Sequence, residues 1–257
     1  MVSHYTPTMP SDHFGPVADG YAAYRPSYPA SLFDALTALA PSTTLAWDCG
    51  CGTGQAALAL AERFAAVCAT DASASQIAHA TPHPRITYGV APAHESGLPD
   101  HGVDLITVAQ ALHWFDVDAF HDEVRRVVVP NGIVAEWSYG LLLVPEMPSI
   151  TLAVQTLDDD LRAWWPPERL HIDNKYADLA FPFDSVDVGA HTMSANWTSA
   201  QLLGYLSTWS AVTRYRAAHR DDPLHAMRSV IAEQWPHSVT RRMEWPLCIR
   251  VGRVPLA

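Results

Sequence analysis

The sequence feature that most constrains the fold is a glycine-rich loop set between a short apolar run and a helix-forming segment. Residues 48–54 read Asp-Cys-Gly-Cys-Gly-Thr-Gly, with the apolar run Leu45–Trp47 before them and an Ala/Leu-rich stretch, 55–64, after them. This order predicts a strand, a loop and a helix. Glycines allow a tight reversal and let a ligand approach the backbone, and a helix start offers unpaired N–H groups and a positive dipole end. The loop therefore predicts a small-molecule site, for a ligand such as a nucleoside.

The glycine spacing narrows the choice of ligand. A dinucleotide fingerprint, G-x-G-x-x-G/A, fails from Gly50 because Gln55 stands at its last position. From Gly52 the same pattern is completed by Ala57, so a nicotinamide-dependent oxidoreductase stays open. A P-loop is excluded because no Gly-Lys-Ser/Thr follows. Asp48 favours S-adenosylmethionine (SAM), because a carboxylate at the strand end repels a pyrophosphate but suits the ammonium and sulfonium of SAM.

The composition excludes several classes of protein. A length of 257 residues with 49% hydrophobic residues fits one α/β domain with insertions. The net charge of -11 argues against broad nucleic-acid binding, which needs a basic surface. The four cysteines lack metal-ligand spacing: Cys49, Cys51, Cys68 and Cys248. Since no transmembrane run or signal-peptide pattern is present, we expect a cytoplasmic protein that binds neither a metal nor a membrane.

The hydrophobic pattern predicts strands that alternate with helices. Apolar runs of strand length stand at 44–47, 65–70, 85–90, 103–108 and 133–137. Helical patterns separate most of these runs, which indicates βαβ units and a parallel sheet. The capping-box sequences Ser73–Gln76 and Thr198–Gln201 predict two helix starts.

The regular alternation of strand and helix patterns ends after Tyr139, where prolines and tryptophans become frequent. Further helices are predicted near 149–163 and 223–235, and further strands at 183–194 and 242–251. Residues 1–12 are predicted to be disordered, and residues 13–257 to form a single domain. We expect cap or substrate insertions at about 140–182 and 195–238.

Several segments between Phe14 and Val251 carry a family resemblance. They are Tyr24-Arg25-Pro26-Ser27-Tyr28-Pro29, the 48–54 loop, Thr70-Asp71-Ala72-Ser73, Gln110-Ala111-Leu112-His113-Trp114-Phe115-Asp116, Trp165-Pro166-Pro167-Glu168-Arg169 and Tyr205-Leu206-Ser207-Thr208-Trp209-Ser210. Together they resemble the class I SAM-dependent methyltransferases, and more narrowly the type 11, trans-aconitate methyltransferase-like branch.

The resemblance implies a Rossmann-like α/β fold. Its seven-stranded sheet is mostly parallel with an antiparallel last strand, has helices on both faces and a helical cap, and holds SAM across the carboxyl ends of strands one, two and four. The activity implied is methyl transfer to a small molecule, with O-methylation of a carboxylate on an acidic metabolite as the expectation. A natural-product O- or N-methyltransferase and a non-catalytic SAM-binding protein stay as alternatives.

The residues expected to hold SAM, and its product S-adenosylhomocysteine, lie at strand ends. Asp48, Gly50, Gly52 and Gly54 form the loop. Asp71 ends the second strand, where a carboxylate can accept both ribose hydroxyls, and Ser73 is the better helix cap, which leaves Asp71 for the ligand.

Other cofactor residues follow from the resemblance. Gln110 is expected under the methionine part of SAM, or as a buried structural amide. Ala93 and His94 are expected near the adenine, although His94 equally suits an exposed loop. Tyr24 and Arg25 are expected in a lid, with Arg25 on the methionine carboxylate or in a surface ion pair.

The catalytic candidates are His113 and Trp114. Trp114 would exclude water and pack on the sulfonium, while His113 would act as a general base or as an orienting donor. The substrate-binding candidates are Trp165, Arg169, Tyr176, Trp209 and Arg214. A carboxylate acceptor needs no base but needs a cation, such as Arg169, Lys175 or Arg214, whereas a phenol or an alcohol would need His113.

Overall fold

The fold is taken from a computed structural model, in which residues 26–255 are described. The segment predicted to be disordered, 1–12, lies outside the described residues, as do the predicted cofactor residues Tyr24 and Arg25.

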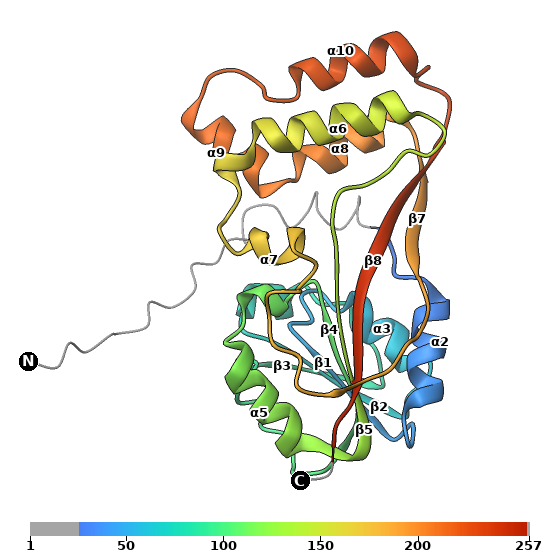
Figure 1. The fold of residues 1–257 in the computed structure, drawn as a ribbon, viewed down its shortest axis with the longest axis vertical. Helices are drawn as coiled ribbons and strands as arrows, with labels where there is room; N and C mark the ends of the chain where they lie inside the picture. The colour runs from blue at the N-terminus through green and yellow to red at the C-terminus, as the bar shows by residue number, and fades with distance from the viewer. Residues whose placement is uncertain (1–25, 256–257) are drawn as a thin grey trace, which may run out of the picture.

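A twisted α/β sheet forms one end of the molecule (Figure 1). Its parallel strands are β1 (Leu45–Cys49), β2 (Ala66–Asp71), β3 (Ile86–Val90), β4 (Val103–Ala109) and β5 (Val128–Tyr139). They lie in the order β3-β2-β1-β4-β5, followed by the antiparallel strand β8 (Arg241–Arg253) and the short strand β6 (Asp184–Ser185). The predicted Rossmann-like sheet with an antiparallel last strand is confirmed, with one further strand, β7 (Thr192–Trp197), paired to β8.

Strand β8 belongs to two layers of the molecule. Its residues 247–253 pair with β5, whereas residues 241–246 continue beyond the sheet and pair with β7. The prediction of one strand over 183–194 is wrong, because the chain forms β6, leaves the sheet and returns only at β7. The break lies at Gly189, which has a φ of +74° and donates its N–H to the Asp187 carboxylate (2.8 Å).

Both faces of the sheet are buried, as a parallel sheet requires. Successive residues of each strand alternate between the faces. Ala46, Leu105 and Ala135 pack against α2 (Ala30–Leu39) and α3 (Gln55–Ala61). Trp47, Ile106 and Val134 pack against α5 (Val117–Val127). Helices α2 and α5 accordingly lie on opposite sides of the sheet (Figure 1).

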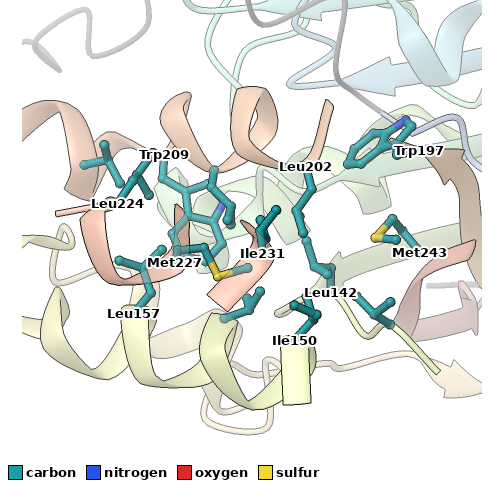
Figure 2. Close-up of a cluster of buried hydrophobic side chains, with 14 of the residues drawn as sticks. Leu142, Ile150, Leu157, Trp197, Leu202, Trp209, Leu224, Met227, Ile231 and Met243 are labelled. Carbon is teal, nitrogen blue, oxygen red and sulfur yellow. The ribbon is translucent and has the colours of Figure 1, made fainter. Parts of the chain in front are cut away.

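A second hydrophobic core lies beyond the carboxyl ends of the parallel strands (Figure 1). It is built by α6 (Pro148–Asp160), α8 (Ser199–Ser207), α9 (Ser210–Ala218) and α10 (His225–Gln234), hereafter the cap helices. Figure 2 shows Leu157, Leu202, Trp209 and Ile231 among the side chains that meet there. The predicted capping box is present in full at the start of α8, between Thr198 and Gln201. That this layer covers a substrate stays a prediction.

The short helix α7 (Arg169–Asp173) lies between the cap helices and the sheet (Figure 1), while the 3-10 turn η4 (Arg162–Trp164) contacts α6 and α9. Within the described residues, no helix combines the length and the apolar character needed to cross a bilayer.

Replacing Leu157 by alanine should destabilise the protein by about 2 to 5 kcal/mol, because the side chain is buried in the cap core and its loss leaves a cavity. The matched control is Leu152→Ala on the same helix, α6. Leu152 is 62% exposed, so this change should cost less than about 0.5 kcal/mol. Urea unfolding measures both, and equal losses would contradict the placement of α6 in a packed core.

Candidate functional site

The candidate site lies where the strand order reverses. Strand β1 has β2 on one side and β4 on the other, so the connections that follow β1 and β4 leave the sheet toward opposite faces. In open α/β sheets the crevice at this switch point, at the carboxyl ends of the strands, binds ligands. Asp48, Asp71 and Gln110 come from the ends of the three strands that surround it.

The glycine loop joins β1 to α3 in a conformation that requires glycine. Gly50, Gly52 and Gly54 have φ angles of +70°, +53° and +92°. A Cβ on Gly50 would lie 2.5 Å from the Cβ of Ala111, and one on Gly54 would lie 2.1 Å from the Tyr88 hydroxyl. At Gly52 the nearest atom would be Gln76 Oε1, at 3.7 Å. The backbone is therefore open at Gly52 and closely packed on either side of it.

Three consecutive N–H groups of the loop are bound by the end of β2. The N–H groups of Gly50 and Cys51 donate to the Thr70 carbonyl (2.8 and 3.0 Å), and that of Gly52 donates to Asp71 Oδ2 (2.8 Å). Gly54 donates to the Cys51 carbonyl (2.9 Å). A pyrophosphate cradled by this loop would need such N–H groups, and they are already used within the protein.

Asp71 anchors two backbone segments at once. Besides the bond from Gly52, its Oδ1 accepts the N–H of Ser73 (2.8 Å). Ser73 caps α4 (Ala74–Ala78) as predicted, but the expectation that Asp71 is thereby left free is wrong. A carboxylate offers about four lone-pair positions, so these two bonds do not by themselves exhaust its capacity as an acceptor.

Asp48 is buried beneath the loop and 1% exposed. Thr107 Oγ1 donates to its Oδ1 (2.8 Å), while Oδ2 has no hydrogen bond to a described residue. Burial raises the pKa of Asp48 to about 7, and the charge of Asp71 adds to the rise. Thr107 and the nearby N–H of Ala57 lower this pKa, the latter without a hydrogen bond of normal geometry. A carboxyl in this position is a weaker attraction for a cationic ligand than the sequence indicates.

Gln110 directly follows β4 and has a φ of +57°, which is unusual for a residue with a Cβ. Its side-chain amide accepts the N–H of Tyr139 (2.9 Å) and donates to the carbonyl of the same residue (3.2 Å). The amide thus ties the end of β4 to the end of β5. Ala93 and His94 lie in the turn after β3, with Ala93 half-buried and His94 exposed.

His113 and Trp114 lie together in a 3-10 turn after β4, η3 (Leu112–Trp114). Trp114 is 37% exposed, while His113 is buried and its Nδ1 lies 3.1 Å from the Tyr176 hydroxyl. Burial, and after it the nearby His171 and Arg169, lower the pKa of His113 to about 3. The imidazole is therefore neutral throughout the physiological range.

The five predicted substrate residues fall into two groups. Tyr176 and Trp209 are buried; Tyr176 has no exposed surface, and its hydroxyl contacts His113. Trp165 is half-buried between Trp209 and the Arg169 guanidinium, which lies 4.3 Å from the centre of its ring.

The two arginines of this set differ in their partners. Arg169 is paired with Asp173 (3.0 Å) and Asp158 (3.5 Å). Arg214 is half-buried and donates to the Trp164 carbonyl (3.4 Å), with no carboxylate partner among the described residues. Within that part of the chain no cluster of histidine, cysteine or acidic side chains could hold a metal ion.

A buried ion network beside the site escaped prediction from sequence. Glu136 on β5 accepts from Arg250 on β8 (2.6 Å) and bonds His121 on α5 (2.8 Å). Arg250 also donates to the carbonyls of Tyr176 and Leu179, both at 2.8 Å. The signal that could have found it is a charged residue inside each of two apolar strands, because a buried charge needs a partner.

The raised pKa of Asp48 predicts a pH dependence of stability. The pKa of the Asp48 carboxyl is 3.8 in the unfolded chain and about 7 in the folded protein, so the folded protein binds this proton more tightly. The free energy of unfolding is therefore highest at low pH and decreases as the pH rises from about 4 to 8. Between these pH values the free energy of unfolding of the wild type should fall by about 4 kcal/mol more than that of Asp48→Asn. Unfolding by urea at a series of pH values measures it, with the exposed Asp118→Asn as control. Parallel profiles for wild type and Asp48→Asn would contradict the burial of this charge.

Comparison with known proteins identifies the family. The family described as Methyltransferase domain matches residues 47–135, from β1 into β5. A candidate methyltransferase of Dictyostelium discoideum is 30% identical over 236 residues, which cover 90% of this chain and 89% of that protein. An uncharacterized methyltransferase of Mycobacterium tuberculosis is 37% identical over 122 residues, which cover 46% of this chain and 49% of that protein.

A solved structure from Anaeromyxobacter dehalogenans, described as a candidate type II methyltransferase, agrees over nearly the whole fold. It is 42% identical, covers 91% of this chain and 100% of its own, and superposes with a TM-score of 0.84. The chain belongs to the class I SAM-dependent methyltransferases.

Proposed function

We propose that this protein transfers a methyl group from SAM to a small-molecule acceptor, and that the acceptor atom is a carboxylate oxygen of an acidic metabolite. The main support for SAM as the cofactor is that Thr70 and Asp71 accept hydrogen bonds from the N–H groups of the glycine loop. A loop whose N–H groups are occupied suits a cofactor without phosphate, which SAM is and a nicotinamide dinucleotide is not.

The residues of the switch point fit SAM. Gly52 offers open backbone, and the half-buried Asp71 would accept the ribose hydroxyls. Gln110 would lie beneath the methionine part, and the exposed ring of Trp114 would keep water from the reacting atoms. When bound, SAM supplies a methyl group on a positively charged sulfur that is already activated for displacement.

The state of His113 supports a carboxylate acceptor. With a pKa of about 3, its imidazole would take a proton from a phenol only at a cost of about 9 kcal/mol. A carboxylate is already ionised at neutral pH and needs no base. His113 is then an orienting group beside the acceptor, held by Tyr176.

The charges around this turn also favour an acidic acceptor. Arg169 lies near His113 but is paired with Asp173 and Asp158, whereas Arg214 of the cap helices has no carboxylate partner among the described residues. The unpaired charge of Arg214 would attract an anionic molecule to this end of the fold.

Asp71→Asn should weaken SAM binding at least about tenfold, because it removes a charged acceptor of the ribose hydroxyls. The control is Asp118→Asn, an exposed aspartate in the first turn of α5, which should bind SAM within about twofold of wild type. Titration calorimetry with SAM, and with NAD in parallel, measures both. Binding of NAD, or unchanged SAM affinity in Asp71→Asn, would contradict the proposed cofactor site.

The acceptor group can be read from the stability of the product. After incubation with methyl-labelled SAM and a cell-metabolite extract, mild alkali should release the label as methanol, because it hydrolyses a methyl ester and leaves ethers and N-methyl groups intact. Alkali-stable label would contradict a carboxylate acceptor and favour a natural-product O- or N-methyltransferase. SAM binding without any transfer would favour a non-catalytic SAM-binding protein.

A further inference from the structure

A cavity of about 550 Å³ lies at the junction of β5 and β8, beside α7. This volume is within the range of small-molecule pockets. Its lining includes Ser138 and Leu141, from the end of β5 and just beyond it, and Lys175, just after α7. Strand β5 is the neighbour of β4, so the cavity lies one to two strand spacings, roughly 5 to 10 Å, from the crevice between β1 and β4.

One wall of the cavity is a gap in the pairing of β8. On the side away from β5, Val251 accepts the N–H of Val186 (2.8 Å) and Leu247 donates to His191 (2.9 Å). Between these bonds residues 187–190 turn away at Gly189, which also lines the cavity. Backbone groups alternate in direction along an antiparallel strand, so the N–H and carbonyl of Ile249 face this gap.

The charge of the cavity comes from Lys175, the single lysine of the chain. It is exposed and forms no ion pair with a described residue, whereas Asp173 on the same wall is paired with Arg169 (3.0 Å). The rest of the wall is largely apolar, with Leu141, Ile172, Pro246, Leu247 and Ile249. An anionic head on an apolar body matches this lining.

The position of Lys175 is fixed by the structure around it. Lys175 and Tyr176 have φ angles of +56° and +60°, a conformation unfavourable for residues with a Cβ. Two hydrogen bonds hold this conformation. The Cys248 thiol donates to the Lys175 carbonyl (3.3 Å), and Arg250, which is paired with the buried Glu136, donates to the Tyr176 carbonyl (2.8 Å). Such enforced conformations gather at ligand sites.

The same turn links the cavity to the reaction side of the fold. Tyr176, next to Lys175, bonds His113 of η3 through its hydroxyl (3.1 Å). Ser138 lines the cavity opposite Cys248 in the β5–β8 register, and its buried hydroxyl has no partner among the described residues. A buried hydroxyl without a partner is costly, and an oxygen of a ligand would satisfy it.

We propose that this cavity binds the methyl acceptor as a monocarboxylate, with the carboxylate paired to Lys175 and the apolar body against Leu141, Leu247 and Ile249. This assignment rests on the proposed function and adds to it the place of the acceptor and the residue that orients it.

The lone lysine allows a direct test. Reductive ¹³C-dimethylation keeps the charge of Lys175 and gives a single side-chain NMR signal, besides that of the terminal amine. With the protein saturated by S-adenosylhomocysteine, small aliphatic and aromatic monocarboxylates should shift this signal saturably, and their neutral primary amides should not. Lys175→Met should weaken carboxylate binding about fivefold in calorimetry. Arg220→Met, at an exposed arginine without an ion pair among the described residues, should leave it unchanged.

Three results would overturn the assignment: no saturable shift from any acid of the panel, methylation of an acid that leaves the Lys175 signal in place, or equal binding by Lys175→Met. Failure of the proposed function is seen separately, either as absent S-adenosylhomocysteine binding before any acid is added or as alkali-stable label in the experiment with the metabolite extract.

Discussion

The rest of the site depends on the hydrogen bonds between the glycine loop and the last two residues of β2. Thr70 and Asp71 together accept three consecutive loop N–H groups. This fixes the loop in a conformation that three glycines alone permit, and it leaves the backbone open at Gly52. Because these N–H groups are already hydrogen-bonded within the protein, they are not free to bind a phosphate. One set of hydrogen bonds therefore shapes the proposed cofactor site and disfavours phosphate-bearing cofactors there.

Strand β8 connects the sheet to the cap helices and borders the proposed acceptor cavity. Because its 13 residues run through both layers, Val251 lies in the core of the sheet while Met243 and Trp245 lie in the core of the cap helices. The two cores are thus joined by continuous backbone. Arg250 on the same strand, paired with the buried Glu136 of β5, holds the turn that carries Lys175 and Tyr176. The cap helices and the proposed acceptor cavity are thus both held by β8, the cavity with the help of the Glu136 charge on β5.

Local patterns in the sequence predicted much of the sheet. Apolar periodicity gave β1 to β4 within a residue or two, and side-chain capping gave the starts of α4 and α8, since both signals act between near neighbours. The features that were missed are bonds between distant segments. The charge of Asp48 was visible in the sequence, but its burial against Thr107 was not. Nor could periodicity show that the chain leaves the sheet at Gly189, because an Asx turn there outweighs the apolar run.

The measurement that tests the central claim most directly is a structure of the protein with S-adenosylhomocysteine bound. We expect both ribose hydroxyls within hydrogen-bond distance of Asp71, with the bond from Gly52 to Asp71 retained and the ligand passing over Gly52. The sulfur should face η3 and the cavity that contains Lys175. A ligand bound elsewhere, or one whose ribose lies away from Asp71 while the loop keeps its present bonds, would contradict this expectation.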